Sequence, residues 1–233
     1  MAAPGRRRAR YSPPPTCGAR RGFARAAVRH TEESRIPTIL LVDSPLLDRV
    51  ESFDPGEAEA GHAVDRPSIG GNLVSGGERD ADGRAVGPGE TRASGLEKRW
   101  RRLEILRQRL ESSNAMLGIA EDVSWEDYEA VALGWGSSAG AVAEGVSLAL
   151  REGIRALAVH PRALHPLPHR LLVRIRERFD ERHILVFEQN PMGDLARHLR
   201  AELGLKAQSH RGLDGWPLRP QEVLARLREV FAR

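Results

Sequence analysis

The chain has 233 residues, of which 40% are hydrophobic, and its formal net charge is +4. Nine Arg and only two Glu lie in residues 1–35, so the positive charge belongs to a tail and the rest of the chain is net negative. This distribution argues against a nucleic-acid partner, which needs a basic patch on the folded part. The one cysteine, Cys17, excludes an intrachain disulfide and an all-cysteine iron–sulfur cluster. No apolar run approaches the roughly 18 residues that span a bilayer, so we expect a soluble, cytoplasmic protein without a membrane partner.

Residues 1–35 combine Arg runs with three consecutive prolines and show no apolar periodicity, so we expect a disordered basic tail. The tail has the Arg-rich, acid-poor character of an organelle transit peptide, but a non-native extension is the favoured interpretation. The near-continuous apolar run at 36–43 is typical of a strand buried on both faces. It has no evident partner strand, so it has the form of the last strand of a domain whose beginning is missing.

Residues 49–95 are rich in glycine pairs and are predicted to form a linker. An acidic turn at 80–83 suggests a calcium loop. An EF-hand, however, needs an oxygen ligand at its fifth position and a glutamate at its twelfth, which here are Arg84 and Thr91. The calcium pattern therefore fails, and a solvated linker is the favoured interpretation.

A connecting helix is predicted over 96–115, because apolar residues recur there at steps of three and four: Leu96, Trp100, Leu103, Leu106 and Leu110. Beyond it, residues 116–233 alternate between strand and helix patterns. Strands are predicted at 129–134, 154–159, 183–188 and 205–209, and helices at 139–152, 167–179, 191–203 and 220–231. Such alternation predicts an α/β fold, with a mainly parallel sheet of about four to five strands and helices on both faces.

The residues at the predicted helix ends agree with this scheme. Gly153 and Gly204 each lie just past a helix, where glycine commonly ends it. The pair Asn190-Pro191 fits an N-cap followed by proline in the first helical position, and Pro220 fits the same position in the last helix.

Three chemical interpretations compete at the glycine-serine turn of residues 134–140. The turn could be a dinucleotide-binding loop, but its G-x-G-x-x-x-G spacing is one residue longer than the G-x-G-x-x-G fingerprint. The next predicted strand also ends without an acidic residue to hold a ribose. As a G-x-S-x-G nucleophile elbow around Ser138 it lacks the strands that should precede it. As a helix N-terminus it could hold a phosphate or carboxylate. The favoured interpretation is structural, with Ser137 or Ser138 capping the helix.

Three histidines lie close together in a proline-rich segment: His160, His165 and His169. They could bind a metal, but no acidic partner is near in sequence, so a structural loop is favoured.

Several phrases in order resemble a known family. They are Val131 to Gly140, Leu-His-Pro-Leu-Pro at 164–168, Val-Phe-Glu-Gln-Asn-Pro-Met-Gly-Asp-Leu-Ala at 186–196, and Gly-Trp-Pro-Leu-Arg-Pro-Gln-Glu-Val at 215–223. Upstream, Pro-Thr-Ile-Leu-Leu-Val-Asp at 37–43, residues 70–83 and Glu-Lys-Arg-Trp-Arg-Arg-Leu at 97–103 extend the likeness. Together they resemble the transketolase C-terminal-like domain of 2-oxoacid:ferredoxin oxidoreductase alpha subunits, most closely the 2-oxoglutarate branch.

The resemblance implies oxidative decarboxylation of a 2-oxoacid with coenzyme A and electron transfer to ferredoxin. It implies that residues 36–48 are a remnant of a thiamine pyrimidine-binding domain that is otherwise missing, so no catalytic residue is assigned to this chain. A beta subunit would supply the diphosphate end of thiamine diphosphate and an iron–sulfur cluster, so this chain alone would bind no cofactor. Its own part would be structural, in subunit contacts.

Five residues are candidates for ligand or subunit contacts, because open α/β sheets bind ligands at the carboxyl ends of their strands. They are Ser137, Ser138, Gly140, Glu188 and Asn190. A packing or capping role is the favoured alternative for each. For the chain as a whole the alternative is a stand-alone α/β module without redox activity, either a small-anion binder or a relic.

Overall fold

The structure is a computed structural model that describes residues 17–34, 36–48, 50, 52, 90–112, 124–212 and 214–232. The chain divides into two compact units. The first contains residues 42–51 and 110–233, and the second contains residues 17–41 and 52–109. Most of the predicted linker at 49–95, with its acidic turn, lies outside the described residues.

The second unit contains helix α1 (Cys17–Ser34) and most of helix α3 (Glu90–Ser112). Helix α3 begins earlier than the helix predicted over 96–115, and the end of that prediction lies outside the described residues. Helix α1 lies where a disordered tail was expected. Its inward positions recur at helical spacing, but three of the four are short or polar and therefore escaped an apolar pattern search. These half-buried residues are Phe23, Ala26, Ala27 and His30.

Residues 36–43 differ from the buried strand that the sequence predicts. They form neither helix nor strand, and Ile39 to Val42 are exposed. The short helix α2 (Ser44–Leu47) follows them. A strand forms only where a neighbour pairs with its backbone, and none of the described strands pairs with this run.

The first unit is built on a four-stranded sheet in the order β2-β1-β3-β4. The strands are β1 (Ala130–Gly134), β2 (Ala156–Val159), β3 (Ile184–Glu188) and β4 (Gln208–Arg211), and every adjacent pair is parallel. The predicted α/β fold with a parallel sheet is confirmed. Strand β4 begins later than predicted because Gly204, with φ 62°, ends the preceding helix and Leu205 packs into the core.

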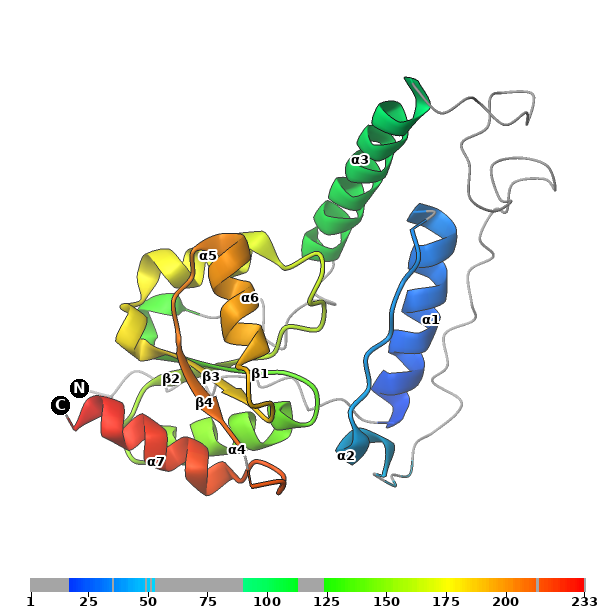
Figure 1. The fold of residues 1–233 in the computed structure, drawn as a ribbon. Coiled ribbons are helices and arrows are strands. Elements are labelled where there is room, and N and C mark those ends of the chain that lie inside the picture. Colours follow the sequence, from blue (N-terminus) through cyan, green and yellow to red (C-terminus); the bar gives the residue numbers. More distant parts are fainter. Residues whose placement is uncertain are drawn as a thin grey trace, which may run out of the picture. The chain divides into compact units, whose positions relative to one another are not determined.

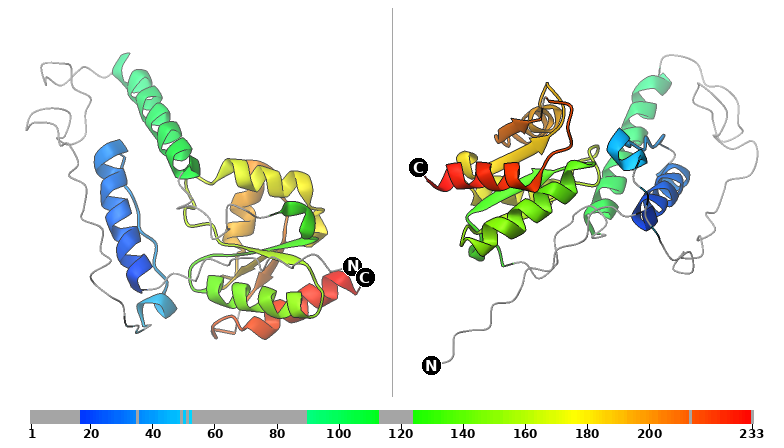
Figure 2. Two further views of the ribbon diagram at one scale, coloured as in Figure 1. Left: turned by 180° about the vertical axis from the view of Figure 1, so that it is seen from behind. Right: turned by 90° about the horizontal axis from the view of Figure 1, so that it is seen from below.

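Helices cover both faces of the sheet (Figures 1 and 2). On one face lie α4 (Ser138–Arg151) and α7 (Pro220–Phe231), and on the other lie α5 (His169–Arg178) and α6 (Asp194–Leu203). Two short 3₁₀ turns, Trp125–Asp127 and Glu181–His183, precede β1 and β3. None of the described helices has the length and apolar character that crossing a membrane requires.

Two hydrophobic cores lie on opposite faces of the sheet, because successive strand residues point to opposite sides. Val131 and Leu133 of β1 pack with α5 and α6, whereas Ala130 and Ala132 pack with α4 and α7. Because the residues on this second face are small, α4 and α7 approach each other closely. A Cβ added at Gly145 of α4 would lie 2.5 Å from Val223 Cβ and 2.7 Å from the Pro220 carbonyl oxygen.

The two sheet edges differ in character. Strand β4 carries Gln208, Ser209, His210 and Arg211, which alternate between half-buried and exposed positions. Strand β2 carries Ala156 to Val159 and is almost wholly buried. The sequence predicted strands at both places, but only β4 has the polar composition of an edge that meets solvent.

Two of the predicted helix ends need comment. Pro220 does occupy the first turn of α7, as predicted. The prediction of Asn190 as N-cap and Pro191 as first residue of a helix is wrong, because α6 begins at Asp194. Gly193, in a left-handed conformation at φ 66°, sets the entry into α6, and Asn190 contributes from further back.

Candidate functional site

The candidate residues gather at the carboxyl edge of the sheet, at the point where the strand order reverses. From β1 the chain proceeds outward to β2, and from β3 it proceeds outward to β4 on the other side. Loops after β1 and β3 therefore flank the switch point, where open α/β sheets commonly bind ligands. Ser137, Ser138 and Gly140 follow β1, and Glu188 and Asn190 end or follow β3.

Ser138 is buried, and its hydroxyl is used within the turn. Its Oγ accepts a hydrogen bond from the Trp135 N–H at 3.0 Å. The same Oγ lies 2.8 Å from the Trp135 carbonyl and 3.1 Å from the Phe187 carbonyl, to either of which its proton can be donated. Among the described residues no histidine is hydrogen-bonded to it. Ser138 therefore ties the β1 loop to β3, and the geometry does not support a nucleophile elbow.

Asp43 lies at the N-terminus of α4. Its Oδ2 accepts a hydrogen bond from the Ser137 N–H at 2.8 Å, across 94 positions of sequence. Gly136 makes room for this approach, since it has φ 57° and a Cβ there would lie 2.8 Å from Asp43 Oδ2. The other oxygen, Oδ1, is buried without a hydrogen-bond partner. A carboxylate from the chain itself thus occupies the position that the sequence analysis considered for a phosphate.

Ser137 and Gln189 join the two loops at the switch point. The Ser137 hydroxyl lies 3.2 Å from Gln189 Oε1 and donates to it. Gln189 Nε2 in turn donates to the Trp216 carbonyl at 2.7 Å, which attaches the loop after β4. The indole of Trp216 is exposed, and so is Met192 in the loop after β3. The sequence analysis did not select Gln189, Met192 or Trp216.

Glu188 is almost fully buried at the end of β3, and four donors surround its carboxylate. Oε2 accepts from the Leu195 N–H and from Asn190 Nδ2, each at 2.8 Å. Oε1 accepts from the Ala196 N–H at 3.3 Å and from Ser209 Oγ at 3.2 Å. The charge therefore lies at the positive end of the α6 dipole with its lone pairs in use. Glu188 acts as a buried cap of α6.

Asn190 completes this arrangement. Its Nδ2 donates to Glu188, and its Oδ1 accepts from the Asp194 N–H at 3.0 Å. Two side chains from the end of one strand thus satisfy three backbone N–H groups of the helix that follows. Gly140 lies in the first turn of α4, half-buried, and brings no side chain to the edge.

Two histidines, His160 and His198, are hydrogen-bonded to backbone carbonyls. Nδ1 of His160 lies 2.8 Å from the Gly134 carbonyl, so the neutral ring donates from Nδ1. Burial lowers the pKa of His160, although the hydrogen bond to Gly134 acts in the opposite direction. His198 Nε2 lies 2.7 Å from the Leu164 carbonyl, and its ring is 6.5 Å from that of His165. The described residues contain no group of three or more His, Cys, Asp or Glu placed to hold a metal, and His169 joins no such group.

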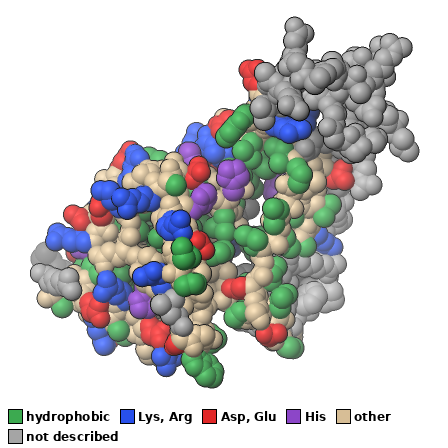
Figure 3. All heavy atoms as spheres, in the orientation of Figure 1, with side chains coloured by type: hydrophobic (Ala, Val, Ile, Leu, Met, Phe, Trp, Pro, Cys, Tyr) green, Lys and Arg blue, Asp and Glu red, His purple; other side chains and the backbone are tan. Residues whose placement is uncertain are grey.

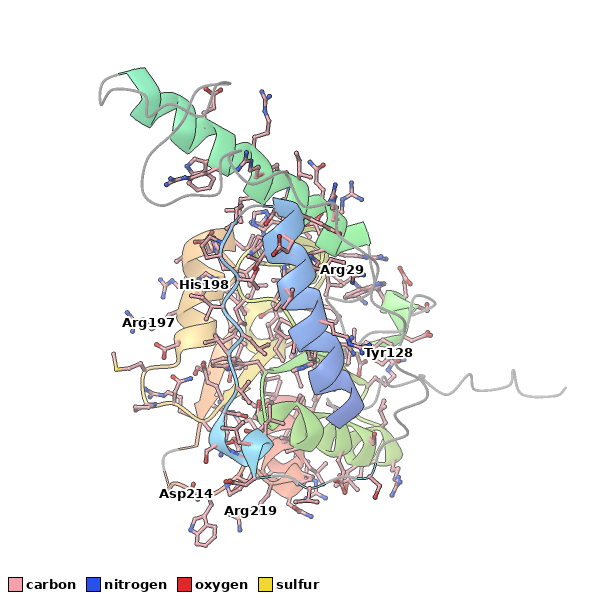
Figure 4. The ribbon with its side chains drawn as sticks, turned by 90° about the vertical axis from the view of Figure 1, so that its right-hand side faces the viewer. Arg29, Tyr128, Arg197, His198, Asp214 and Arg219 are labelled. Atoms are coloured by element: carbon pink, nitrogen blue, oxygen red, sulfur yellow. The ribbon has the colours of Figure 1, made fainter. Side chains whose placement is uncertain are left out.

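Charged side chains around the edge are mostly paired with neighbours. Arg219 donates to Glu222, and the resulting hydrogen bond lowers the pKa of Glu222. Arg197 and His198 project from α6, and Asp214 and Arg219 lie at the loop before α7 (Figure 4). Figure 3 shows basic and acidic side chains interspersed over the face that carries α5 and α6. The first unit is thus a doubly wound α/β domain whose carboxyl edge is held together by its own polar groups.

Two curated proteins and a solved structure are similar to this chain. The chain is 27% identical over 144 residues to 2-oxoacid:ferredoxin oxidoreductase 1, subunit alpha, of Aeropyrum pernix. The aligned region covers 60% of this chain and 22% of that protein. It is 28% identical over 162 residues to 2-oxoacid:ferredoxin oxidoreductase 2, subunit alpha, of the same organism, which covers 68% of this chain and 24% of that protein. The chain therefore spans less than a quarter of the length of the curated relatives it matches. No protein-family model matches the sequence.

The fold has a counterpart among solved structures. A 2-oxoglutarate:ferredoxin oxidoreductase from Magnetococcus marinus, solved with 2-oxoglutarate, coenzyme A and succinyl-CoA bound, superimposes with a TM-score of 0.57. The superposition covers 86% of this chain and 29% of that chain at 21% identity. The two proteins thus share a fold over most of this sequence.

Proposed function

We propose that this chain is part of the alpha subunit of a 2-oxoacid:ferredoxin oxidoreductase, in the 2-oxoglutarate branch. The observation that carries the proposal is that both curated relatives are alpha subunits of such enzymes, matched over 60% and 68% of the chain. The shared fold with the Magnetococcus marinus enzyme agrees with it. The reaction would be thiamine diphosphate-dependent oxidative decarboxylation of the 2-oxoacid to an acyl-CoA.

Within such an enzyme this chain would be a structural part. The polar groups that reach the carboxyl edge already bind one another: Glu188 has four donors, and Ser138 holds the β1 loop. They are placed to keep the loops after β1 and β3 in fixed positions. Ser137, Gly140 and Asn190 lie on those loops or at the helix that follows, where a neighbouring subunit would meet them.

The cofactors of such a complex would be held elsewhere. An all-cysteine iron–sulfur cluster needs several thiolates, and Cys17 is the one cysteine of the sequence, so we infer that another subunit would hold the cluster. We therefore assign thiamine diphosphate, the iron–sulfur cluster and coenzyme A to the complex, with a beta subunit as partner and ferredoxin as electron acceptor. Residues 36–48 would belong to the pyrimidine-binding domain of such a subunit.

The alternative function is a stand-alone α/β module without redox activity. The observation in its favour is that the sheet is covered on both faces by its own helices, with two complete cores. In its small-anion form the alternative meets an obstacle, because the carboxylate of Asp43 already occupies the N-terminus of α4.

The experiment is co-expression with the beta subunit from the same genome and with a polypeptide that supplies the unmatched part of an alpha subunit. We expect co-purification and coenzyme A-dependent reduction of a low-potential dye with 2-oxoglutarate. Pyruvate as substrate tests the branch. A chain that purifies alone and adds nothing to the rate would support the stand-alone module instead.

A further inference from the structure

His30 lies near the end of helix α1, on the face that the helix turns inward. The ring is half-buried, as are Phe23, Ala26 and Ala27 on the same face. Its Nδ1 atom is buried and has no hydrogen-bond partner among the described residues. In the neutral ring the proton can stay on Nε2, which leaves Nδ1 as a bare acceptor. A protonated ring carries an N–H at both nitrogens, so protonation would bury a donor that has no acceptor.

The backbone around His30 is held in place by Ser34. The Ser34 hydroxyl donates to the His30 carbonyl at 2.6 Å and accepts from the Ile36 N–H at 3.2 Å. Ser34 is itself buried. The last turn of α1 is therefore tied to the residues that follow it, and the ring stays where Nδ1 meets no acceptor.

Three charged side chains act on the ring: Arg29 and Glu33 of its own helix, and Arg109 of α3. Arg109 donates to Glu33 at 3.2 Å, and this ion pair joins the end of α1 to α3 within the second unit. The carboxylate of the group is thus already paired, and two cations with one anion leave a positive charge around the ring. Burial lowers the pKa of His30 from its ordinary 6.5, and Arg29 and Arg109 act in the same direction, whereas Glu33 acts against them.

We propose that His30 and these three charges form a pH-sensitive switch, which packs the end of α1 while the ring is neutral and releases it when the ring is protonated. The step takes up one proton from water and needs no other reactant. Among the charged groups that act on the ring, Glu33 alone can offset the added charge. A Glu33 carboxylate that turns to the ring gives up Arg109, and with it the ion pair to α3. In the released helix end, water satisfies both ring nitrogens.

The direction of the switch follows from linkage. The released helix end binds the proton more tightly than the packed one, because folding lowers the pKa of His30. Packing is therefore at full strength above about pH 6.5 and weakens as the pH falls below that value. One proton can change the packing equilibrium by up to about tenfold between pH 7.5 and 5.5.

The experiment uses the full chain. NMR titration of the histidine rings gives their midpoints, and the ring signal that is absent from His30→Gln belongs to His30. Hydrogen exchange, corrected for the intrinsic pH dependence of each amide, gives the protection of residues 26–34 at pH 7.5 and 5.5. We expect a His30 midpoint below 6.5 and a loss of protection of the size that this midpoint sets by linkage.

Variants assign the effect to the ring and its neighbours. His30→Gln removes the titration, so protection of α1 should be the same at both pH values, whereas His169→Asn, a histidine of the first unit, should keep the loss. Glu33→Gln removes the carboxylate that favours the protonated ring, so the midpoint of His30 should fall further. Glu97→Gln, at an exposed position of α3, is its matched control and should leave that midpoint unchanged. If α1 does not form in His30→Gln, His30→Leu takes its place, because leucine keeps an apolar group at the half-buried position.

Four results would overturn the inference. One is a His30 midpoint at or above 6.5. Another is equal protection of α1 at the two pH values in the parent protein. The third is an equal loss of protection in the variant without His30, which would assign the release to other groups. The last is a His30 midpoint that Glu33→Gln leaves unchanged, since the switch requires that carboxylate to act on the ring.

Discussion

The carboxylate of Asp43 accepts a hydrogen bond from the backbone N–H of Ser137 at 2.8 Å, although the two residues lie 94 positions apart. No side chain from the turn itself caps α4. The cap comes instead from a distant segment, and the positive φ of Gly136 admits it. Asp43, which precedes α2, is thereby attached to the corner at the switch point.

Replacing Asp43 should measure this attachment. Asp43→Ala removes the acceptor at the N-terminus of α4, and loss of an N-cap costs about 1 kcal/mol of unfolding free energy. Urea unfolding gives the value. Asp48→Ala is the control, because Asp48 is exposed and accepts a hydrogen bond from the Ser44 hydroxyl at 3.3 Å. Equal effects of the two variants would show that the Asp43 cap contributes nothing particular.

Glu188 should be intolerant of conservative change. Glu188→Gln keeps the shape but turns two of its hydrogen-bond acceptor positions into an amide that faces donors, which should cost about 1–3 kcal/mol. Each carboxylate oxygen accepts from one N–H group of the first turn of α6, so the amide leaves either Leu195 or Ala196 without its acceptor, and hydrogen exchange of that residue should accelerate. Glu177→Gln, at an exposed ion pair with Arg176, serves as the control and should change stability little. A stable Glu188→Gln variant with unchanged exchange would contradict the capping role.

Gly145 should reject any side chain. In Gly145→Ala the new methyl group would lie within 2.8 Å of Val223 and Pro220, so α4 and α7 must separate. Overpacking of this kind costs about 1–3 kcal/mol, measured by urea unfolding. Gly22→Ala in α1 is the matched control, because no atom lies within 4 Å of its added Cβ. There the helix propensity of alanine should stabilise α1 by up to about 1 kcal/mol. Equal tolerance at both positions would disprove the close approach of α4 and α7.

The lowered pKa of His160 predicts a pH dependence. Burial, partly offset by the Gly134 carbonyl, keeps the ring neutral in the folded state below the pH at which it protonates in the unfolded chain. The unfolded state then binds more protons, so stability should fall as the pH drops below about 6.5. His160→Asn retains a donor for Gly134 and should reduce this slope between pH 7.5 and 5.5, measured by urea unfolding. A slope identical to that of the parent protein would assign the pH dependence to other groups. His169→Asn is the control.

The sequence predicted the sheet and its helices well because buried parallel strands are written as continuous apolar runs, such as Ala130 to Gly134 and Ile184 to Phe187. Strand ends placed Ser137, Ser138, Glu188 and Asn190 on one edge for the same reason. What each side chain does there was not readable. A glutamate at the end of a strand looks the same in sequence whether it caps a helix or binds a ligand. The four donors around Glu188 in the structure distinguish the two roles.

The misses have physical causes too. Helix α1 has inward positions filled largely by alanine, so its periodicity is weak in hydropathy. The start of α6 moved to Asp194 because Gly193 adopts a left-handed conformation that a proline rule does not anticipate. Asp43 has no local signal at all, since its partner is distant in the chain. The run at 36–43 reads as a strand because its side chains are aliphatic, yet a strand also needs a neighbour.

The polar edge strand β4 has a consequence for how copies of this domain behave at high concentration. Its side chains form hydrogen bonds within the domain. Ser209 bonds to Glu188, and Arg211 bonds to the Pro191 carbonyl. Gln208 bonds to Arg226 and to the Arg182 carbonyl. A second copy that continued the sheet there would have to break these bonds and bring two Arg211 side chains together. Polar, hydrogen-bonded side chains along β4 therefore disfavour edge-to-edge pairing of two copies of this domain through that strand.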